Sequence, residues 1–228
     1  MFLHPLTKLT GFRASWIPRL CGVDVLGDRS FALRNLAPHH DRIIAEGFPE
    51  TETRHHAEQI HGKGVAIISE KSSKKILTHP DVDGLVTNIP GQLLAIYVAD
   101  CAAIYLADPV TRSIALLHSG KKGTELNILS EGLKKMQETF GTNPADLTCV
   151  LSPCIRPPDY DTDFAATIRS QASDLGIKNF HDSCENTASN TSTHYSYRQE
   201  KGQTGRMLAL LSVVGASCPS PFRGIPAP

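Results

Sequence analysis

The chain has 228 residues, of which 40% are hydrophobic and 20% charged, a composition typical of a globular protein with a sizeable core. Lysine and arginine together number 23, as do aspartate and glutamate, so the formal net charge is zero and no strong field attracts nucleic acid or an anionic membrane. We therefore expect neither a nucleic-acid partner nor a membrane partner.

The first residues, MFLHPLTKLTGFRASW, do not resemble a targeting segment. Polar residues and a proline interrupt their apolar residues, so the unbroken apolar stretch of a signal peptide is lacking. No segment reaches the roughly 18 consecutive apolar residues of a membrane helix. The six cysteines are scattered without a CxxC pair, which favours reduced thiols. Together these features predict a cytoplasmic protein.

A helix, a turn and a strand are expected between residues 49 and 69. The segment PETETRHHAEQI (49–60) is polar, is rich in helix-forming residues and follows a proline-containing turn, which favours a helix. The apolar run GVAIIS (64–69) contains β-branched residues and predicts a strand. Gln59, Ile60, His61 and Gly62 then form the turn between them.

Three apolar runs follow: LLAIYV (93–98), AAIYLA (102–107) and SIALLH (113–118). Short breaks at 99–101 and 108–112 separate them, and we expect three buried central strands. From Gly123 the spacing of apolar residues changes to three and four, which predicts an amphipathic helix that ends at Gly141.

The rest of the chain predicts one more strand and two more helices. LTCVLS (147–152) is typical of a strand, Asp163 is expected to cap a helix that runs to about Leu175, and residues 205–214 are expected to form a last helix. The prolines of PSPFRGIPAP (219–228) indicate a tail after a domain of residues 1–218. The expected fold class is α+β (mixed α/β), in a single domain.

Three metal-competent side chains stand at the ends of predicted strands: His61, Cys101 and His118. Strand ends present side chains to a cleft, and two imidazoles with one thiolate suit a tetrahedral Zn²⁺ whose fourth position is open. The alternative is that the histidines are only hydrogen-bonded and that Cys101 is an inert thiol of the core.

Five segments in order resemble one known family: QIHG, DGLVTNIPGQLLAIYVADCAAIYLADP, HSGKKGT, LSPCIRPPDYD and HYSYRQEKGQTGRM. The resemblance is to the laccase-domain family, also called multicopper polyphenol oxidoreductase, purine nucleoside phosphorylase or peptidoglycan-editing factor, and it covers roughly residues 17–212. It implies a single domain in which mixed β-sheets are layered between helices. It also implies that His61, Cys101 and His118 bind zinc.

The resemblance implies phosphorolysis of purine nucleosides (adenosine, inosine, guanosine and methylthioadenosine) together with deamination of adenosine. The partners would be a purine nucleoside and phosphate, and the protein a monomer or homodimer. Asp100 is a candidate for moving protons or orienting a ligand, although it could equally cap a turn. Three cations suited to phosphate lie in the family motifs: Lys122, Arg198 and Arg206. Two tyrosines there, Tyr160 and Tyr197, could stack on a purine.

The sequence departs from the family pattern beside the third expected ligand. Lys121 and Lys122 stand where the family has Trp-Arg, so positive charge is kept while the aromatic surface and the bidentate fork of arginine are lost. Ser119 replaces the small residue of His-Ala-Gly, and Pro158-Asp159 replaces a cysteine pair before Tyr160. We therefore expect substrate preference to differ more than the metal site.

Other functions use the same residues. A copper oxidase is disfavoured because multicopper centres need paired His-x-His motifs, and the chain has none. A metal-free cysteine hydrolase would use Cys101 as the nucleophile and His118 or His61 as the base. A factor that edits peptidoglycan precursors is the third alternative, which the family name implies.

Overall fold

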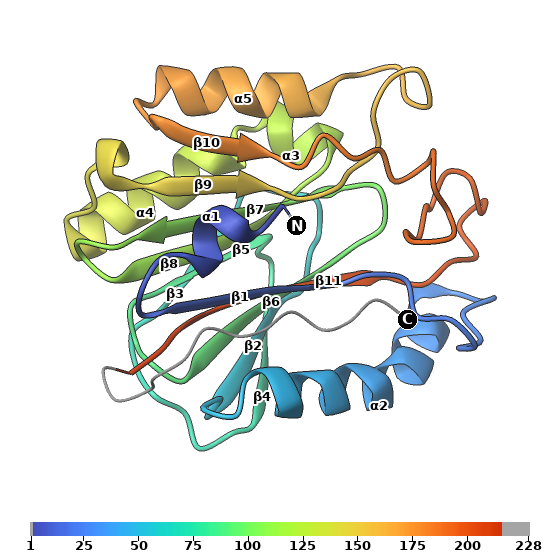
Figure 1. The fold of residues 1–228 in the computed structure, drawn as a ribbon, viewed down its shortest axis with the longest axis horizontal. Helices are drawn as coiled ribbons and strands as arrows, with labels where there is room; N and C mark the ends of the chain where they lie inside the picture. Colours follow the sequence, from blue (N-terminus) through green and yellow to red (C-terminus); the bar gives the residue numbers. More distant parts are fainter. Residues whose placement is uncertain (1, 216–228) are drawn as a thin grey trace.

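The computed structural model describes residues 2–215, in which two β-sheets pack face to face with helices on both outer sides (Figure 1). The expected tail (219–228) lies outside the described residues. The helices are α1 (His4–Thr7), α2 (Arg29–Gly47), α3 (Lys121–Glu125), α4 (Ile128–Phe140) and α5 (Phe164–Asp174), with a 3₁₀ turn at Pro144–Asp146. The strands are β1 (Phe12–Ile17), β2 (Thr53–Ala57), β3 (Val65–Ile68), β4 (Ile76–His79), β5 (Gly84–Thr87), β6 (Gln92–Val98), β7 (Ala102–Asp108), β8 (Ser113–Ser119), β9 (Thr148–Leu151), β10 (Asn179–Asp182) and β11 (Met207–Val213).

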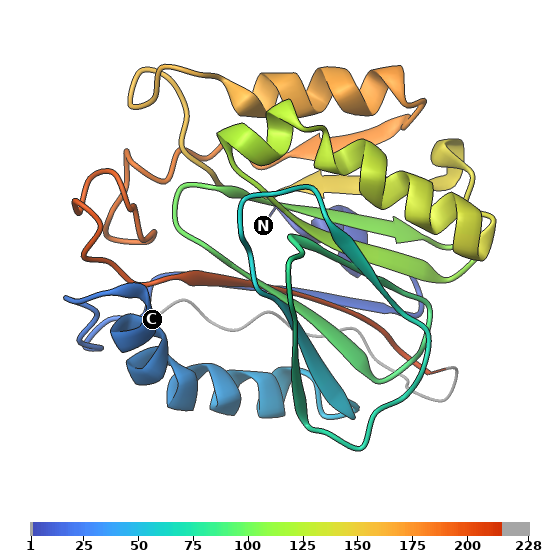
Figure 2. The same cartoon turned by 180° about the vertical axis from the view of Figure 1, so that it is seen from behind.

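The two sheets have five and six strands, and both mix parallel and antiparallel pairs. The first has the order β1-β11-β6-β2-β4 and the second the order β10-β9-β7-β8-β5-β3. Helix α2 covers the outer face of the first sheet, whereas α3, α4 and α5 cover the outer face of the second (Figures 1 and 2). The expected single domain with mixed sheets layered between helices is confirmed.

The apolar runs of the central strands reflect burial on both faces of each sheet. Along β11, Met207, Ala209 and Leu211 face the core between the sheets, while Leu208 and Leu210 pack toward α2. Strands β6, β7 and β8 alternate in the same way, since successive side chains point to opposite faces of a sheet. A strand with both faces covered reads as a continuous apolar run.

Several predicted elements are confirmed. The three apolar runs form β6, β7 and β8, and the runs at 64–69 and 147–152 form β3 and β9. The side chain of Asp163 accepts a hydrogen bond from the backbone N–H of Ala166 (2.9 Å) and caps α5. Gly141 ends α4 with φ +74°, a left-handed conformation that glycine adopts without strain.

The helix expected from Gly123 to Gly141 is instead two helices. Asn127 adopts a left-handed conformation (φ 55°) between α3 and α4, and its side chain accepts a hydrogen bond from Ser130 N. The break turns Leu126 outward, where it is 41% exposed, so this residue does not join the apolar stripe.

Two helix predictions are wrong. Within residues 49–60, Thr53–Ala57 form β2, which pairs in parallel with both β4 and β6 and is buried along its whole length. The last predicted helix is β11, which pairs with β1 on one side and β6 on the other. In both segments, sheet pairing overrides local helix propensity. Helix α2 was not predicted from the sequence, although Asp28 caps it by accepting from Phe31 N (2.7 Å).

Candidate functional site

His61, Cys101 and His118 meet at one end of the two-sheet core. One ligand atom from each lies within 4.8 Å of the other two. His118 comes from the end of β8, Cys101 from the connection between β6 and β7, and His61 from the loop after β2. The rings of His61 and His118 meet edge to face, with centroids 4.9 Å apart. The structure therefore brings together three residues that lie far apart in the sequence.

The loop that carries His61 is held in a strained conformation by neighbouring side chains. Gln59 (φ 66°) and His61 (φ 60°) both occupy the left-handed region, which is unfavourable for residues with a Cβ. The amide of Gln59 bonds to the backbone of Tyr97 in β6, donating to its oxygen (2.6 Å) and accepting from its N–H (3.0 Å). This side chain thus extends the pairing of the sheet edge and fixes the start of the loop.

Asp83, which sequence reasoning did not identify, joins two of the three residues. Its fully buried carboxylate accepts hydrogen bonds from the backbone N–H groups of His61 (2.9 Å) and Gly62 (2.7 Å). It also accepts from Nδ1 of His118 at 2.7 Å. Because Nδ1–H of His118 donates its hydrogen bond to the carboxylate, Nε2 of His118 is the nitrogen left to face Cys101. The only signal for this role in the sequence was an aspartate just before a strand.

The electrostatics of the site favour an ionised thiol. Burial raises the pKa of Cys101, but the charges of His118 and His61 and their hydrogen bonds outweigh this effect and lower the pKa to about 6. Burial likewise lowers the pKa of His118, yet Cys101 and Asp83 raise it to about 9. Without a metal, these shifts favour a thiolate at Cys101 and an imidazolium at His118.

The backbone approaches the thiol closely at Gly120. A Cβ at this position would lie 2.5 Å from Sγ of Cys101, so a larger residue would displace the sulfur. Glycine is required here by space rather than by conformation. The close approach lets α3 begin directly beside the three residues.

The donor set fits a zinc ion. One thiolate and two imidazoles are borderline-soft ligands of the kind that zinc prefers, and the ionised Cys101 is ready to coordinate. Metal binding would require loss of the His118 proton, which makes affinity dependent on pH. The carboxylate of Asp83, which accepts the hydrogen bond from Nδ1 of His118, completes an arrangement common around zinc-binding histidines.

The three residues line a pocket of about 760 Å³. The other predicted site residues also line it: Asp100, Lys122, Tyr160, Arg198 and Arg206. Arg29, Lys121 and Lys201 add three more cations, of which Arg29 and Lys201 were not identified from the sequence. Arg198 lies over the ring of Tyr160 (5.1 Å to the centroid), and Phe164 meets the same ring at 6.1 Å. The lining of the pocket thus combines aromatic rings with several positive charges.

The carboxylate of Asp100 is engaged with the protein on both sides. It accepts hydrogen bonds from the hydroxyl of Thr187 (2.7 Å) and from the backbone N–H of Arg198 (2.8 Å). The residue itself has φ 78°, a left-handed conformation. These contacts tie the connection before Cys101 to the loop that carries Arg198.

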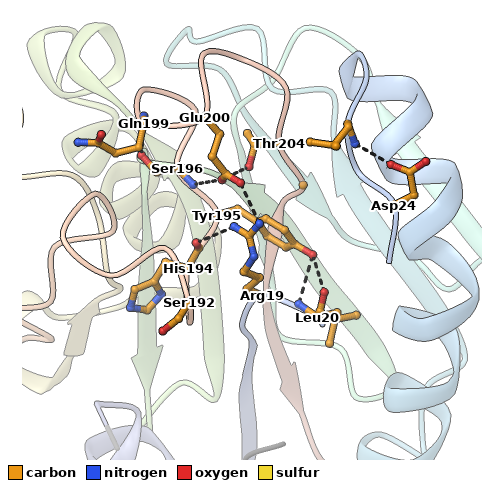
Figure 3. Close-up of polar contacts among 12 residues, drawn as sticks. Arg19, Leu20, Asp24, Ser192, His194, Tyr195, Ser196, Gln199, Glu200 and Thr204 are labelled. Atoms are coloured by element: carbon orange, nitrogen blue, oxygen red, sulfur yellow. Dashed lines mark hydrogen bonds and ion pairs between the residues drawn. The ribbon is translucent and has the colours of Figure 1, made fainter. Parts of the chain in front are cut away.

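Glu200 anchors the loop between β10 and β11 (Figure 3). This loop supplies three of the pocket cations. Its carboxylate accepts from Arg19 (2.8 Å), from the hydroxyl of Thr204 (2.5 Å) and from the N–H of Ser196 (3.0 Å). Nearby, the hydroxyl of Tyr195 contacts the backbone of Leu20. The loop is therefore fixed to the N-terminal segment.

The comparisons with known proteins agree with this architecture. The sequence model of the family described as multi-copper polyphenol oxidoreductase laccase matches residues 32–163 and 158–214. The chain is 29% identical over 162 residues to the purine nucleoside phosphorylase YlmD of Bacillus subtilis, and the alignment covers 58% of each chain. It is 28% identical over 215 residues to a purine nucleoside phosphorylase of Deinococcus radiodurans, covering 82% of this chain and 81% of the relative.

Solved structures show the same fold. The crystal structure of YlmD from Geobacillus stearothermophilus has a TM-score of 0.76 at 23% identity and covers 91% of this chain and 93% of its own. The Bacillus licheniformis protein YfiH has a TM-score of 0.74 at 20% identity and covers 90% of this chain and 94% of its own.

Within residues 2–215, no helix has the length and apolar character needed to cross a membrane.

Proposed function

Because the chain belongs to the multi-copper polyphenol oxidoreductase laccase family, we propose that it is a zinc-dependent purine nucleoside phosphorylase that also deaminates adenosine. The observation that carries the proposal is the meeting of His61, Cys101 and His118 within 4.8 Å at the wall of a cationic pocket. Relatives named purine nucleoside phosphorylase support the substrate class, which would include adenosine, inosine, guanosine and methylthioadenosine.

The proposal assigns zinc to His61, Cys101 and His118, and Asp83 holds two of these ligands in place. When bound, zinc supplies Lewis-acid chemistry at this position. The family name refers to copper, but the thiolate and two imidazoles are too few ligands for a multicopper centre.

The cations of the pocket would hold phosphate. Phosphorolysis needs positive charge around a phosphate that attacks the anomeric carbon of the ribose while the purine leaves. Lys122 and Arg198, which line the pocket, would supply this charge, and the ring of Tyr160 would offer a stacking face for a purine. Asp100 holds the backbone of Arg198, so we assign it a positioning role in addition to its candidacy as a proton carrier.

The partners of the protein would be a purine nucleoside and phosphate. The cytoplasmic location and the monomeric or homodimeric state remain predictions from the sequence.

The first test is the metal content of the purified protein with adenosine turnover in phosphate buffer. We expect about one zinc per chain in the wild type, and loss of both zinc and turnover in Cys101→Ala, because zinc needs the thiolate. Mass spectrometry measures the metal, and chromatography measures inosine and adenine. Cys149→Ala is a matched control, since this buried thiol lies in β9 outside the pocket.

A metal-free cysteine hydrolase is the second candidate, and the thiolate–imidazolium pair of Cys101 and His118 favours it. Activity that persists without metal, is inhibited by added zinc and disappears in Cys101→Ala would replace the phosphorylase proposal with this one. Turnover that depends on copper would contradict both.

A further inference from the structure

The charge of the pocket exceeds what a nucleoside and one phosphate require. Among the described residues, Asp100 supplies the one carboxylate of the pocket. Six cationic side chains line it: Arg29, Lys121, Lys122, Arg198, Lys201 and Arg206. A nucleoside is uncharged, and inorganic phosphate carries between one and two negative charges near neutral pH. Both oxygens of Asp100 already accept hydrogen bonds. The pocket therefore has unbalanced positive charge.

None of these six cations forms an ion pair with a carboxylate in the described part of the chain. The nearby Glu200 is not available to them, because Arg19, Thr204 and Ser196 occupy it. In a protein of zero net charge, six cations without carboxylate partners around one pocket indicate an anionic ligand.

Of the six cations, Arg29 and Arg206 are the two best suited to form an anion-binding site. They come from the first turn of α2 and from the residue just before β11, and both line the pocket. Burial and then the charge of Arg29 lower the pKa of Arg206, whereas Cys101, Tyr197 and Asp100 act to raise it. Two like charges that line one pocket repel each other, and an anion between them removes the repulsion.

The guanidinium of Arg206 is held in a fixed position. Its Nη1 donates to the backbone oxygens of Thr204 (2.9 Å) and Gly205 (2.8 Å), and its Cζ lies 5.8 Å from the centroid of the Tyr197 ring. Among the described residues, its other nitrogens have no hydrogen-bond partner. A guanidinium held in this way is suited to bidentate binding of a phosphoryl group.

A separate pair of cations stands beside the three metal-competent residues. Lys121 and Lys122 open α3 directly after Gly120, whose backbone touches Cys101. They are placed to receive inorganic phosphate near the reacting centre, so the Arg29–Arg206 pair is additional to that requirement.

We propose that Arg29 and Arg206 form a phosphoryl-binding subsite of the pocket and that the protein therefore binds nucleoside monophosphates in preference to the corresponding nucleosides. The nucleoside part of this ligand rests on the proposed function. The phosphoryl part rests on the two arginines.

Calorimetric titration of the purified full-length protein with adenosine 5′-monophosphate, adenosine and inorganic phosphate tests the subsite. We expect the monophosphate to bind about tenfold or more tightly than adenosine, since charge-assisted bidentate contacts are among the stronger hydrogen bonds. In Arg29→Gln and Arg206→Gln the ratio of the two affinities falls toward one. Arg42→Gln is the control, because Arg42 is an exposed arginine of α2 outside the pocket, and it keeps the wild-type ratio.

Equal affinity of the wild type for the monophosphate and adenosine would overturn the subsite. So would phosphate binding that weakens in the variants without any preference for the monophosphate, because the pair would then serve inorganic phosphate alone. If Arg206→Gln does not fold, Arg29→Gln and Arg206→Lys decide the question. Turnover of adenosine is measured separately: its absence in zinc-loaded protein that still prefers the monophosphate contradicts the proposed function but leaves the subsite standing.

Discussion

At the scale of single residues, the site depends on a carboxylate that binds no substrate. Asp83 contacts the backbone N–H groups of His61 and Gly62 and the ring of His118, so it sets both a loop conformation and an imidazole orientation. Burial raises its pKa, but hydrogen bonds from His118 and Gly62 outweigh burial and lower it. The carboxylate therefore stays ionised, as an acceptor of three hydrogen bonds must.

Replacing Asp83 with asparagine keeps the shape and removes the charge. We expect zinc affinity to fall by about 10- to 100-fold, because the amide cannot accept every hydrogen bond that the carboxylate accepts. Competition with a chromophoric chelator measures the affinity. Asp108→Asn is the matched control, since Asp108 is equally buried and accepts hydrogen bonds from Val110 and Thr111 in a turn outside the pocket. Equal zinc affinity in the two variants would show that Asp83 acts only on stability.

At the scale of elements, two histidines lie buried between α2 and the first sheet. His40 of α2 and His56 of β2 are 1% and 8% exposed and pack against the ring of Tyr97 in β6 (5.9 and 5.2 Å between centroids). Neither ring nitrogen of His40 has a hydrogen-bond partner in the described chain. Burial, then the nearby Arg54, lower the pKa of His40 to about 4 and that of His56 to about 3.

These shifts predict acid sensitivity. Both histidines titrate near pH 6.5 when unfolded, so below this pH the unfolded state binds more protons and the free energy of unfolding falls. The loss continues until the pH reaches the folded-state values and amounts to about 1.4 kcal/mol per pH unit for each group. His39, His55, Arg29, Arg54 and Asp41 surround the pair, and Asp41 is the one acidic group among them.

Urea unfolding at about pH 7.5 and about pH 5, with EDTA present to remove the contribution of metal, tests this expectation. His40→Leu/His56→Leu should be less sensitive to acid than the wild type, because leucine does not titrate. His4→Gln, a change at an exposed histidine of α1, should retain the wild-type sensitivity. A double variant as acid-sensitive as the wild type would contradict the assignment.

At the scale of the whole molecule, the pocket draws on both sheets and on segments from nearly the whole described chain. Residues from the start of α2, the ends of β6 and β8, α3 and the loop before β11 line one cavity. The ion pair between Arg19 and Glu200 joins segments 181 residues apart and fixes the loop that carries Arg198 and Arg206 (Figure 3). The positions of these two pocket arginines thus depend on a contact between segments distant in the sequence.

Removing the Glu200 carboxylate should loosen this loop. In Glu200→Ala, the partners Arg19, Thr204 and Ser196 lose their acceptor, and we expect a loss of about 1–3 kcal/mol in unfolding free energy. Amide exchange should increase in residues 194–206, as measured by mass spectrometry. Glu138→Ala, which removes an exposed partner of Lys134 on α4, should change neither quantity measurably. Loop exchange equal in the two variants would show that Glu200 does not anchor the loop.

The sequence by itself determined the elements whose signals are local. The apolar runs of β6, β7 and β8 record burial on both faces, and the caps at Asp163 and Gly141 mark helix ends directly. It also isolated His61, Cys101 and His118, because a change from apolar run to polar residue places a side chain at a strand end.

Only the tertiary structure decided what depends on partners distant in sequence. Residues 207–213 are a strand because β1 and β6 pair with them on both sides, although a short apolar run is equally consistent with a helix. The role of Asp83 and the presence of Arg29 and Arg206 in one pocket likewise follow from packing that brings separate segments together. The local sequence indicates whether a residue is buried, whereas the residues that it contacts are determined only when the chain folds.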